Sequence, residues 1–492
     1  MRRPYAYLAI LIACLFITLA TVNLNTHVSA QSGEKRWVVI FHSQSSMPSN
    51  VDKRVADAGG TILAQLPEVG AVAATSNNPN FAADMSRDSS VSDVAEDVEL
   101  PMIPSPEEMH AQVVAESAVE APGDDTQTGP PGEFFYTPYQ WDKRRIRASN
   151  QGSYAVQQGR PDVVVAVLDT GAQILIGTAP APHPDINANL DYARSRSFFP
   201  VQPNPNGDPT PFAWDDRNGH GSHCMSNIGA PINSFGMVGV APKVKLVALK
   251  VLGDNGSGSF VSLAQALIYA GVNKFDVASM SLSGFLRRSD QNSHVLLKFV
   301  QRAVNFARSN GVTPVAALGN NGFDVSDGNF FRDFLVVPAE VDGVIGVSAT
   351  DFNNQKAGYS NYGMGKTDIS APGGDFNGPP PHFGLVIGAW APDNTALPGA
   401  TYVLAAGTSM ACPQAAGVCA LIISQYGDFT TNGNGKKAHM SPQAVEAILQ
   451  QTANNQPCPD TYVVPTQRCQ GNAGYNNFYG KGIVDAFKAV TQ

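Results

Sequence analysis

The stretch VVVAVLDTG, residues 163–171, decides the fold class of this chain. Six apolar residues run without a break into Asp169 and a glycine turn, which is typical of a strand buried on both faces of a parallel sheet. Similar apolar runs recur at residues 245–251, 276–282, 312–318 and 344–349. Open parallel sheets carry their functional sites at the carboxyl ends of the strands. Asp169 therefore stands where a functional residue is expected.

Segments with helical spacing lie between these apolar runs. In residues 294–308 the apolar side chains recur at helical intervals, and Ser441-Pro442 combines a capping serine with proline at the first helical position. Alternating strands and helices predict an α/β domain with a doubly wound, mostly parallel sheet over residues 133–492.

A smaller unit is predicted ahead of that domain, over residues 31–102. An apolar strand at residues 37–41 is followed by a helix-compatible segment, two short strands, a helix beginning at Asn78-Pro79 and a last strand near residues 94–100. The order β-α-β-β-α-β is that of a small ferredoxin-like α+β domain. Residues 103–132 are rich in Pro, Glu, Ala, Gly and Asp without periodicity, which predicts an exposed linker.

The N-terminal 30 residues have the layout of a secretory signal peptide. Arg2 and Arg3 precede an apolar stretch over residues 8–22, and Val28-Ser29-Ala30 offers small residues for cleavage. The alternative is an uncleaved membrane anchor, for which the apolar run is short. A secreted, extracellular protein without membrane association after removal of the signal is expected, and a periplasm or a vacuole stays open as its destination.

Composition and cysteine content bear on the possible partners of the protein and on the state of its cysteines. Of 492 residues 43% are hydrophobic and 15% charged, and the formal net charge of −9 argues against a nucleic-acid partner. Six cysteines occur, of which Cys14 would leave with the signal, so the remaining five cannot all pair within the chain. Cys458 and Cys469 flank a polar loop and are expected to form a disulfide in an oxidising compartment. The other three are Cys224, Cys412 and Cys419, which lie among apolar or small residues and are predicted to be buried thiols.

Two further motifs carry chemistry. Residues 218–223, NGHGSH, place two histidines in a glycine-rich turn, where they could be metal ligands or loop residues, although no further ligand lies nearby in the sequence. Residues 407–413, GTSMACP, place Ser409 in a tight turn that opens an apolar helix, whose positive end would favour a developing oxyanion. Taken alone, such a serine is an ordinary helix cap.

Taken together, the motifs follow the chain order Asp, His, Ser of the subtilisin arrangement. On the motifs Asp169-Thr170-Gly171, His220-Gly221-Ser222-His223 and Gly407-Thr408-Ser409-Met410-Ala411, residues 133–492 resemble the subtilisin-like serine peptidases, the subtilases. The family more often has Thr at the position of Ser222 and small residues at those of Met225 and Ser226. We expect these departures to change packing without abolishing activity.

The resemblance implies a serine endopeptidase that works through an acyl-enzyme. Ser409 would be the nucleophile, His220 the general base, and Asp169 the group that orients the histidine. Asn320, in the sequence LGNNG after an apolar strand, would donate its side-chain amide to the oxyanion together with the Ser409 backbone N–H.

The resemblance also implies the edges of the substrate cleft. An extended protein or peptide substrate would be bound by strand addition between two segments. The residues assigned to these edges are Leu252, Gly256, Ser257, Gly258, Ser281, Leu282, Ser283 and Gly319. Residues 323–338 form a longer segment than in the family and should line the main side-chain pocket, with an apolar or a basic preference left open.

A structural calcium ion is a further implication, although the chemistry itself needs no cofactor. Asp185 in HPDI, Asn233 in the loop INSFGMVGVAP, and Glu133 at the entry to the domain are the candidate oxygen ligands. All three could equally be turn residues.

Residues 31–102 resemble the inhibitory, folding-assisting propeptide of the same family. The chain would then be a monomeric precursor that is inhibited by its own propeptide and cuts itself between Met102 and Glu133. One rival is a catalytically silent binding module, and a second is a processing peptidase with one protein substrate. A nucleotide-binding protein is disfavoured because no phosphate-binding loop motif occurs. Since the chain ends soon after residues 480–486, without an added β-rich domain, broad proteolysis is expected.

Overall fold

The computed structural model describes residues 34–114, 126–326, 333–430 and 439–492. The predicted signal peptide and Cys14 lie outside these residues. The chain divides into residues 1–34 and residues 35–492, and the description below concerns the second unit. No helix in its described part has the length and apolarity that crossing a membrane would require.

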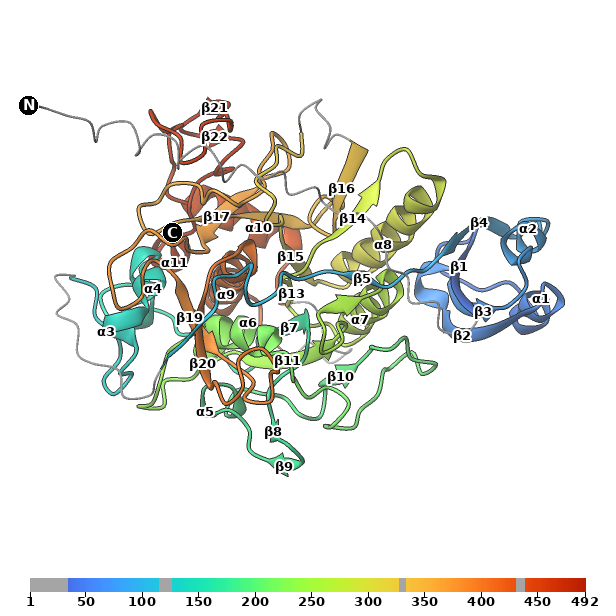
Figure 1. Cartoon of the computed structure of the whole chain (residues 1–492), viewed down its shortest axis with the longest axis horizontal. Coiled ribbons are helices and arrows are strands. Elements are labelled where there is room, and N and C mark those ends of the chain that lie inside the picture. Colours follow the sequence, from blue (N-terminus) through green and yellow to red (C-terminus); the bar gives the residue numbers. More distant parts are fainter. Residues whose placement is uncertain (1–33, 115–125, 327–332, 431–438) are drawn as a thin grey trace, which may run out of the picture. The chain divides into compact units, whose positions relative to one another are not determined.

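The core is a seven-stranded sheet whose neighbouring strands all run parallel (Figure 1). The strands, in spatial order, are β10 (Arg196–Ser197), β11 (Lys245–Lys250), β7 (Val164–Asp169), β13 (Val277–Met280), β15 (Thr313–Ala317), β17 (Ile345–Thr350) and β18 (Ile369–Pro372). The five apolar runs all form strands, which confirms the predicted parallel sheet. The short edge strands β10 and β18 were not predicted, because neither carries a long apolar run.

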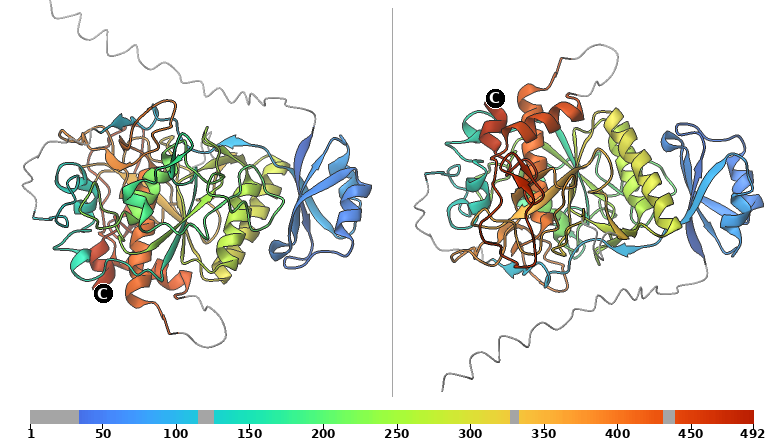
Figure 2. Two further views of the ribbon diagram at one scale, coloured as in Figure 1. Left: turned by 90° about the horizontal axis from the view of Figure 1, so that it is seen from below. Right: turned by 90° about the horizontal axis from the view of Figure 1, so that it is seen from above.

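Helices cover both faces of this sheet (Figure 2). Along β7 the side chains alternate between two apolar clusters: Val165 and Val167 face one of them, and Val164, Ala166 and Leu168 the other. The first cluster includes residues of α6 (His220–Gly229), α9 (Thr408–Tyr426), α10 (Pro442–Thr452) and α11 (Ala486–Val490), and the second includes α7 (Phe260–Val272) and α8 (Gln291–Ser309). Because β7 is buried on both faces, its sequence is a continuous apolar run.

The helix signals are confirmed with small shifts. The Ser441 hydroxyl accepts a hydrogen bond from the Ala444 N–H at 3.3 Å and caps α10, with Pro442 at the first helical position. Helix α8 contains the predicted residues 294–308 and begins at Gln291, where Asp290 accepts from the Ser293 N–H at 2.9 Å.

Residues 35–96 form a four-stranded antiparallel sheet with two short helices. The elements are β1 (Lys35–Phe41), α1 (Val51–Asp57), β2 (Gly60–Leu66), β3 (Ala71–Ser76), α2 (Phe81–Met85) and β4 (Val91–Glu96), in the spatial strand order β2-β3-β1-β4. The chain order is the one predicted. Helix α2 starts at Phe81, after the predicted Asn78, whose Oδ1 accepts from the Asn80 N–H at 3.0 Å while its amide donates to the Ala58 carbonyl at 2.8 Å.

One face of this small sheet packs on α7 and α8. Its apolar side chains share a cluster with Leu296, Phe299 and Val300 of α8. Arg302 of α8 donates to the carbonyls of Phe41 at 3.0 Å and Val69 at 2.9 Å. The guanidinium therefore joins the last residue of β1 to the turn before β3.

The expected exposed linker over residues 103–132 is only partly consistent with the structure. Strand β6 (Gln112–Val113) pairs antiparallel with β20 (Tyr402–Ala405), and the side chain of Met109 is buried. Thr128 also contacts the catalytic domain, since its N–H donates to Gln151 at 2.7 Å. The expected exposure does not hold for Met109 and Val114, because a Pro- and Glu-rich composition does not reveal a few buried apolar residues. Residues 115–125 lie outside the described part.

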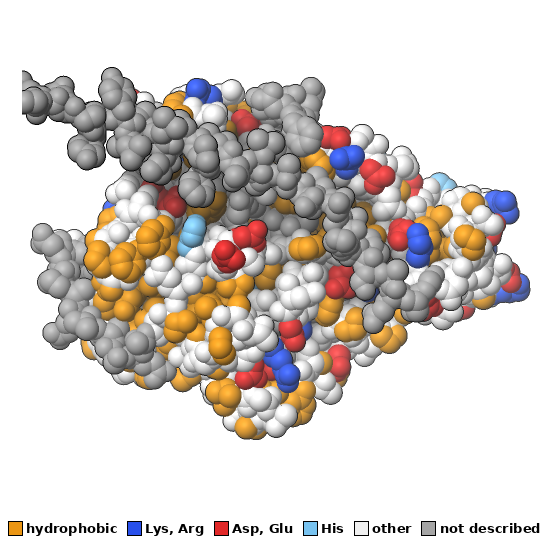
Figure 3. All heavy atoms as spheres, viewed as in Figure 1, with side chains coloured by type: hydrophobic (Ala, Val, Ile, Leu, Met, Phe, Trp, Pro, Cys, Tyr) orange, Lys and Arg blue, Asp and Glu red, His pale blue; other side chains and the backbone are white. Residues whose placement is uncertain are grey.

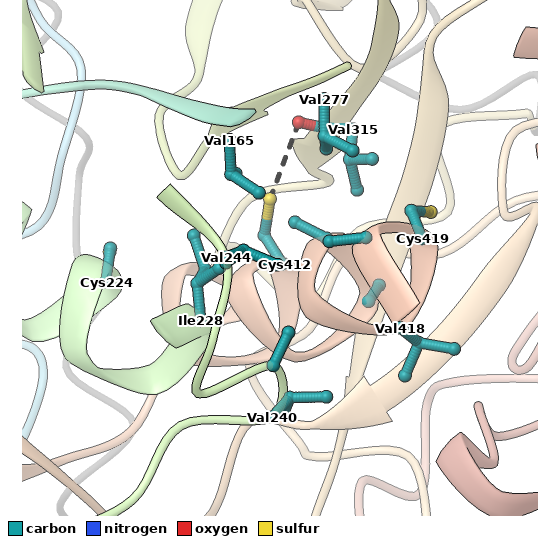
Figure 4. Packing of buried hydrophobic residues seen from close by; sticks show 14 of the residues in the cluster. Val165, Cys224, Ile228, Val240, Val244, Val277, Val315, Cys412, Val418 and Cys419 are labelled. Atoms are coloured by element: carbon teal, nitrogen blue, oxygen red, sulfur yellow. Dashed lines mark hydrogen bonds between the residues drawn. The ribbon is translucent and has the colours of Figure 1, made fainter. Parts of the chain in front are cut away.

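The cysteine predictions are confirmed. Cys458 and Cys469 form a disulfide with their Cα atoms 5.5 Å apart. Cys224, Cys412 and Cys419 are free and buried; the first lies on α6 and the other two on α9 (Figure 4). The disulfide closes a loop whose Gln467 amide donates to the carbonyls of Gly322 at 3.1 Å and Gly358 at 2.8 Å.

Replacing Cys458 and Cys469 together by Ser should lower the stability of the folded chain by about 2–3 kcal/mol, because the unfolded chain regains the entropy of a short loop. Thermal unfolding without reductant measures this shift. Wild type with dithiothreitol should fall to the Tm of the double variant, which should not respond to the reductant. An unchanged Tm in both comparisons would contradict the prediction.

Candidate active site

The predicted triad residues come together at the carboxyl end of the sheet. Asp169 is the last residue of β7, His220 the first residue of α6, and Ser409 the second residue of α9. The Nδ1 atom of His220 lies 2.7 Å from the Asp169 carboxylate, and both side chains are fully buried. This contact fixes the imidazole orientation and leaves its Nε2 free for a proton transfer.

The hydroxyl of Ser409 does not bond to the histidine in this structure. Its Oγ donates to the carbonyl of Ser281 at 3.1 Å, and the Nε2 of His220 is buried without a partner among the described residues. Catalytic hydrogen bonds are often incomplete before substrate binds. Rotation of the serine side chain about χ1 is the movement that would bring Oγ toward Nε2.

Asn320 is oriented as an oxyanion donor requires. Its Oδ1 accepts from the N–H and the hydroxyl of Thr408, both at 2.8 Å, and the Thr408 hydroxyl oxygen in turn accepts from the Gly319 N–H at 3.1 Å. The Nδ2 group of Asn320 has no partner within the described residues. The N-terminus of the long helix α9, with the backbone N–H of Ser409, lies beside it and adds a positive dipole end.

Asp216 organises the turn around the histidine and was missed in the sequence. Its carboxylate accepts from the N–H groups of Asn218 and Gly219, from the Thr170 hydroxyl, and from Ser222. It thereby holds the loop after β7 against the start of α6. The Ser222 hydroxyl also accepts from the Gln173 N–H, so the departure from the family's Thr keeps a hydrogen-bonding hydroxyl.

Cys224 is a second residue that sequence reasoning did not place at the site. Its Sγ lies 3.9 Å from Nδ1 of His220 and 3.5 Å from the carbonyl oxygen of Ser409. Asp169, His220 and Cys224 therefore form a compact buried group. Burial raises the pKa of the Cys224 thiol well above its ordinary value, so the thiol stays protonated at neutral pH. It packs against the pair without competing as a nucleophile.

The two predicted cleft edges hold an extended segment of the chain itself. Strand β12 (Ser257–Gly258) pairs antiparallel with β5 (Leu100–Pro101), and the carbonyl of Gly256 accepts from the Met102 N–H at 3.1 Å. On the other edge, the Ser283 N–H donates to the Met102 carbonyl at 2.8 Å. Gly256 has φ +76, and a Cβ there would lie 2.6 Å from Ile103, so both the turn and the close approach require glycine.

Met102 occupies an apolar pocket between these edges. Its side chain is 3% exposed and belongs to a cluster with Leu252, Phe260, Leu282 and Leu286. The predicted Leu252 and Leu282 belong to the same apolar cluster, and a Cβ on Gly284 would lie 3.5 Å from the Met102 methyl group. The glycines and serines of the edges provide backbone groups. Ser281 contributes its carbonyl to the Ser409 hydroxyl.

The three candidate calcium ligands also meet. The Glu133 carboxylate accepts from the N–H groups of Asn233 at 2.9 Å and Ser234 at 2.8 Å. Asp185 accepts from the Asn233 side chain at 3.2 Å and from the Met237 N–H at 3.0 Å. Burial, and for Glu133 also the charge of Asp185, raises the pKa of each carboxyl group to about 7.

The donor set fits a hard cation. The Oε2 atom of Glu133 is buried and has no partner among the described residues, and neither carboxylate has a cationic partner there. Tyr402, whose hydroxyl donates to Asp185, is a neighbour that the sequence did not reveal. Two buried carboxylates and an amide in one loop cluster are oxygen ligands of the kind that calcium takes.

The region of residues 323–338 is described only in part. Strand β16 (Phe334–Val337) pairs with β14 (Gly284–Arg287), and Phe323 and Asp324 line a cavity of about 630 Å³. Asn320, Tyr359 and Gln467 of the disulfide-closed loop also line it. This cavity beside the oxyanion residue was not predicted, and whether residues 323–338 line the main side-chain pocket stays a prediction.

Comparison with known proteins agrees with this geometry. The model of the subtilase family, Peptidase_S8, matches residues 160–482. M-protease of Shouchella clausii is 35% identical over 328 residues, which are 67% of this chain and 64% of the relative, so the match spans just under two thirds of that protein. Subtilisin NAT of Bacillus subtilis subsp. natto is 29% identical over the full length of both chains.

A solved structure shares the fold. The epidermin leader peptide processing serine protease of Staphylococcus aureus superimposes with a TM-score of 0.67 at 21% identity, covering 94% of this chain and 98% of its own. The matched family model spans the strands and helices that carry Asp169, His220 and Ser409. The chain therefore belongs to the subtilase family of serine endopeptidases.

Proposed function

We propose that this chain is a secreted endopeptidase that hydrolyses peptide bonds through an acyl-enzyme on Ser409. The observation that carries the proposal is the buried 2.7 Å contact between Asp169 and His220 beside a serine at the N-terminus of α9. The chain carries all four residues that the proposed mechanism needs, including Asn320, which argues against a catalytically silent binding module.

In the proposed mechanism the Ser409 hydroxyl turns from the Ser281 carbonyl and attacks the substrate carbonyl while His220 Nε2 takes its proton. Asp169 holds the imidazole and stabilises the imidazolium. The oxyanion accepts hydrogen bonds from Asn320 Nδ2 and the Ser409 N–H. His220 then protonates the leaving amine, and a water molecule hydrolyses the acyl-enzyme by the same proton transfers in reverse.

Backbone pairing at both cleft edges supports broad specificity. Strand addition at Gly256–Gly258 and Ser283 would bind the substrate through backbone hydrogen bonds, which every peptide can form. Side-chain preference would come from the pocket that Met102 fills, whose apolar lining favours long apolar side chains. A processing peptidase with one protein substrate stays the alternative.

Residues 31–102 would act as the inhibitory propeptide, in a ferredoxin-like domain, of a precursor exported by signal peptide 1–30. Its sheet packs on α7 and α8, Arg302 bonds to two of its carbonyls, and its last residues fill the cleft. The full-length match to Subtilisin NAT supports a common precursor organisation. Self-cleavage between Met102 and Glu133 would release a monomeric extracellular enzyme.

We further propose a structural calcium ion on Glu133, Asp185 and Asn233. The ion would neutralise two carboxylates that burial otherwise disfavours in their charged form. It lies outside the catalytic steps, so its effect would be on stability. Asn233 would have to turn its amide oxygen toward the ion.

Asn320→Ala should lower kcat about 10²- to 10³-fold with little change in KM, because an oxyanion donor acts mainly in the transition state. Ser409→Ala should lose on the order of 10⁶-fold and leave the precursor uncut. Steady-state hydrolysis of a peptidyl anilide and electrophoresis of the precursor measure both effects. Equal processing of wild type and Ser409→Ala would contradict the proposed self-cleavage.

Millimolar calcium should raise the Tm of the wild-type protein, and Asp185→Asn should remove most of this gain. The reason is that the ion binds only the folded arrangement of ligands. Calorimetric titration with calcium provides a readout independent of activity. Asp162→Asn, an exposed carboxylate away from the loop, is the matched control. A calcium response that survives in Asp185→Asn would place the ion elsewhere.

Docking of the N-terminal sheet should weaken as pH rises from about 4 to 6. Burial raises the pKa of Asp97 to about 6 in the docked state, against an opposing effect of Arg36. A raised carboxyl pKa means that docking favours the protonated form, so its contribution is greatest below pH 4 and is lost through pH 6. Hydrogen exchange of β1–β4 in the Ser409→Ala precursor measures it.

Asp97→Asn should flatten this pH dependence, since the amide stays neutral and its Oδ1 can still accept from the Val261 N–H. Asp57→Asn, exposed on α1 beside Lys53, should keep the wild-type profile. A wild-type profile in Asp97→Asn would rule out Asp97 as the titrating group.

A further inference from the structure

The chain passes the catalytic residues and stays docked on the far side of the cleft. After Met102 it continues to β6, where Val113 pairs with Val403 and Gln112 with Leu404 of β20. The Ala406 N–H donates to the Met109 carbonyl at 2.9 Å, and the Val114 N–H donates to the Tyr402 carbonyl at 3.0 Å. Residues 112–113 therefore form an added strand on β20, and the hydrogen bonds of Met109 and Val114 extend the contact on either side of it (Figure 1).

The direction of the chain identifies which side of the substrate this strand imitates. Residues 100–102 pair with the two predicted cleft edges, at Gly256–Gly258 and at Ser283. Because a serine peptidase keeps the N-terminal part of its substrate as the acyl group, these earlier residues correspond to that part. Residues 109–114 follow them in sequence and pair just before the turn that holds Ser409. They lie where the departing, C-terminal part of a substrate would bind.

Met109 anchors this strand in an apolar pocket. Its side chain is 1% exposed and clusters with Trp141, Trp390, Val403 and Met410. Met410 directly follows the predicted nucleophile, and a Cβ on Gly219, the residue before His220, would lie 2.4 Å from the Trp390 ring. The anchor thus shares one apolar cluster with Met410, which follows Ser409, and with Trp390, which packs on the glycine before His220.

The surface around this strand is apolar. Figure 3 shows apolar side chains gathered on the part of the face where Figure 1 places α3 (Tyr136–Tyr139), β19 (Val386–Ala389) and β20. Val113, in contrast to Met109, points away from the core, with 56% of its surface exposed. Substitutions of Met109 and Val113 can therefore distinguish the contribution of a buried side chain from that of backbone pairing.

Residues 105–111 form a closed turn between Met102 and β6. The Met109 N–H donates to the Ser105 carbonyl at 3.1 Å and the Ala111 N–H to the Pro106 carbonyl at 2.9 Å. His110 has a left-handed φ of 51. A peptidase of this kind binds its substrate extended. The turn therefore withholds residues 105–108 from cleavage while both flanks stay bound.

We propose that residues 105–114 are a second inhibitory element, which blocks the leaving-group side of the cleft independently of residues 31–102. This inference rests on the proposed propeptide function. A cut near Met102 would free the acyl side only, because residues 109–114 stay joined to the catalytic domain through the following chain. A short tether keeps such a segment at millimolar effective concentration. Full activity then requires a second cut, C-terminal to Val114.

The N-terminal sequence of the active enzyme tests the proposal, with activity first established on a peptidyl anilide and active sites counted by titration. The fully active form should begin C-terminal to Val114. A fully active form that begins between residues 103 and 109 would overturn the inference while leaving the proposed peptidase and propeptide functions intact. Failure to obtain any hydrolysis would instead count against the proposed function.

A synthetic peptide of residues 104–114, PSPEEMHAQVV, tests the docking itself on the mature enzyme. It should inhibit hydrolysis of an internally quenched peptide that spans both sides of the cleft. Met109→Ala in this peptide should weaken inhibition about 10- to 100-fold, because a fully buried side chain is lost. Val113→Ala is the matched control and should inhibit like the parent. Equal inhibition by the Met109→Ala and parent peptides, or none by the parent, would overturn the proposal.

Discussion

The buried contact between Asp169 and His220 is the interaction on which the rest of the site depends. A carboxylate and an imidazole without solvent exposure are tolerated only where hydrogen bonds fix them. Here the doubly covered strand β7 delivers Asp169, and the Asp216 carboxylate ties the glycine turn before His220 to the loop after β7. Helix α9 begins at the same edge of the sheet. Its first two residues are Thr408, which donates to Asn320, and Ser409.

The same backbone geometry that would bind a substrate binds the chain itself. Both cleft edges offer unpaired strand groups, which any extended segment of the right length can use. In the described chain Met102 is buried in an apolar cluster on one side and Met109 in another on the other side. Flexible, unbranched methionine side chains suit this use because they fit pockets that must also accept other residues. The proposed substrate recognition and the proposed self-inhibition would therefore both depend on one structural feature, the backbone groups of the cleft edges.

Much of the fold could be predicted, because buried parallel strands give long apolar runs and because turns that carry Asp169, His220 and Ser409 have local signatures. The disulfide between Cys458 and Cys469 could be expected because the two cysteines flank a polar loop, whereas the role of Asn320 was implied only by the family resemblance. Other residues act only through distant contacts: Asp216 bridges two loops, Cys224 looks like any buried thiol, and Met109 is a single apolar residue in a Pro- and Glu-rich stretch. Composition could not reveal a docked strand whose affinity comes from backbone groups of β20.

The most direct test of the central claim is to locate the residue that reacts with a fluorophosphonate, an electrophile that requires a base-activated serine. Peptide mass spectrometry of the mature enzyme should find the phosphonyl group on Ser409, and the same treatment of His220→Ala should leave Ser409 unmodified because no group takes its proton. Modification of another serine, or equal labelling of Ser409 in the two proteins, would contradict the account.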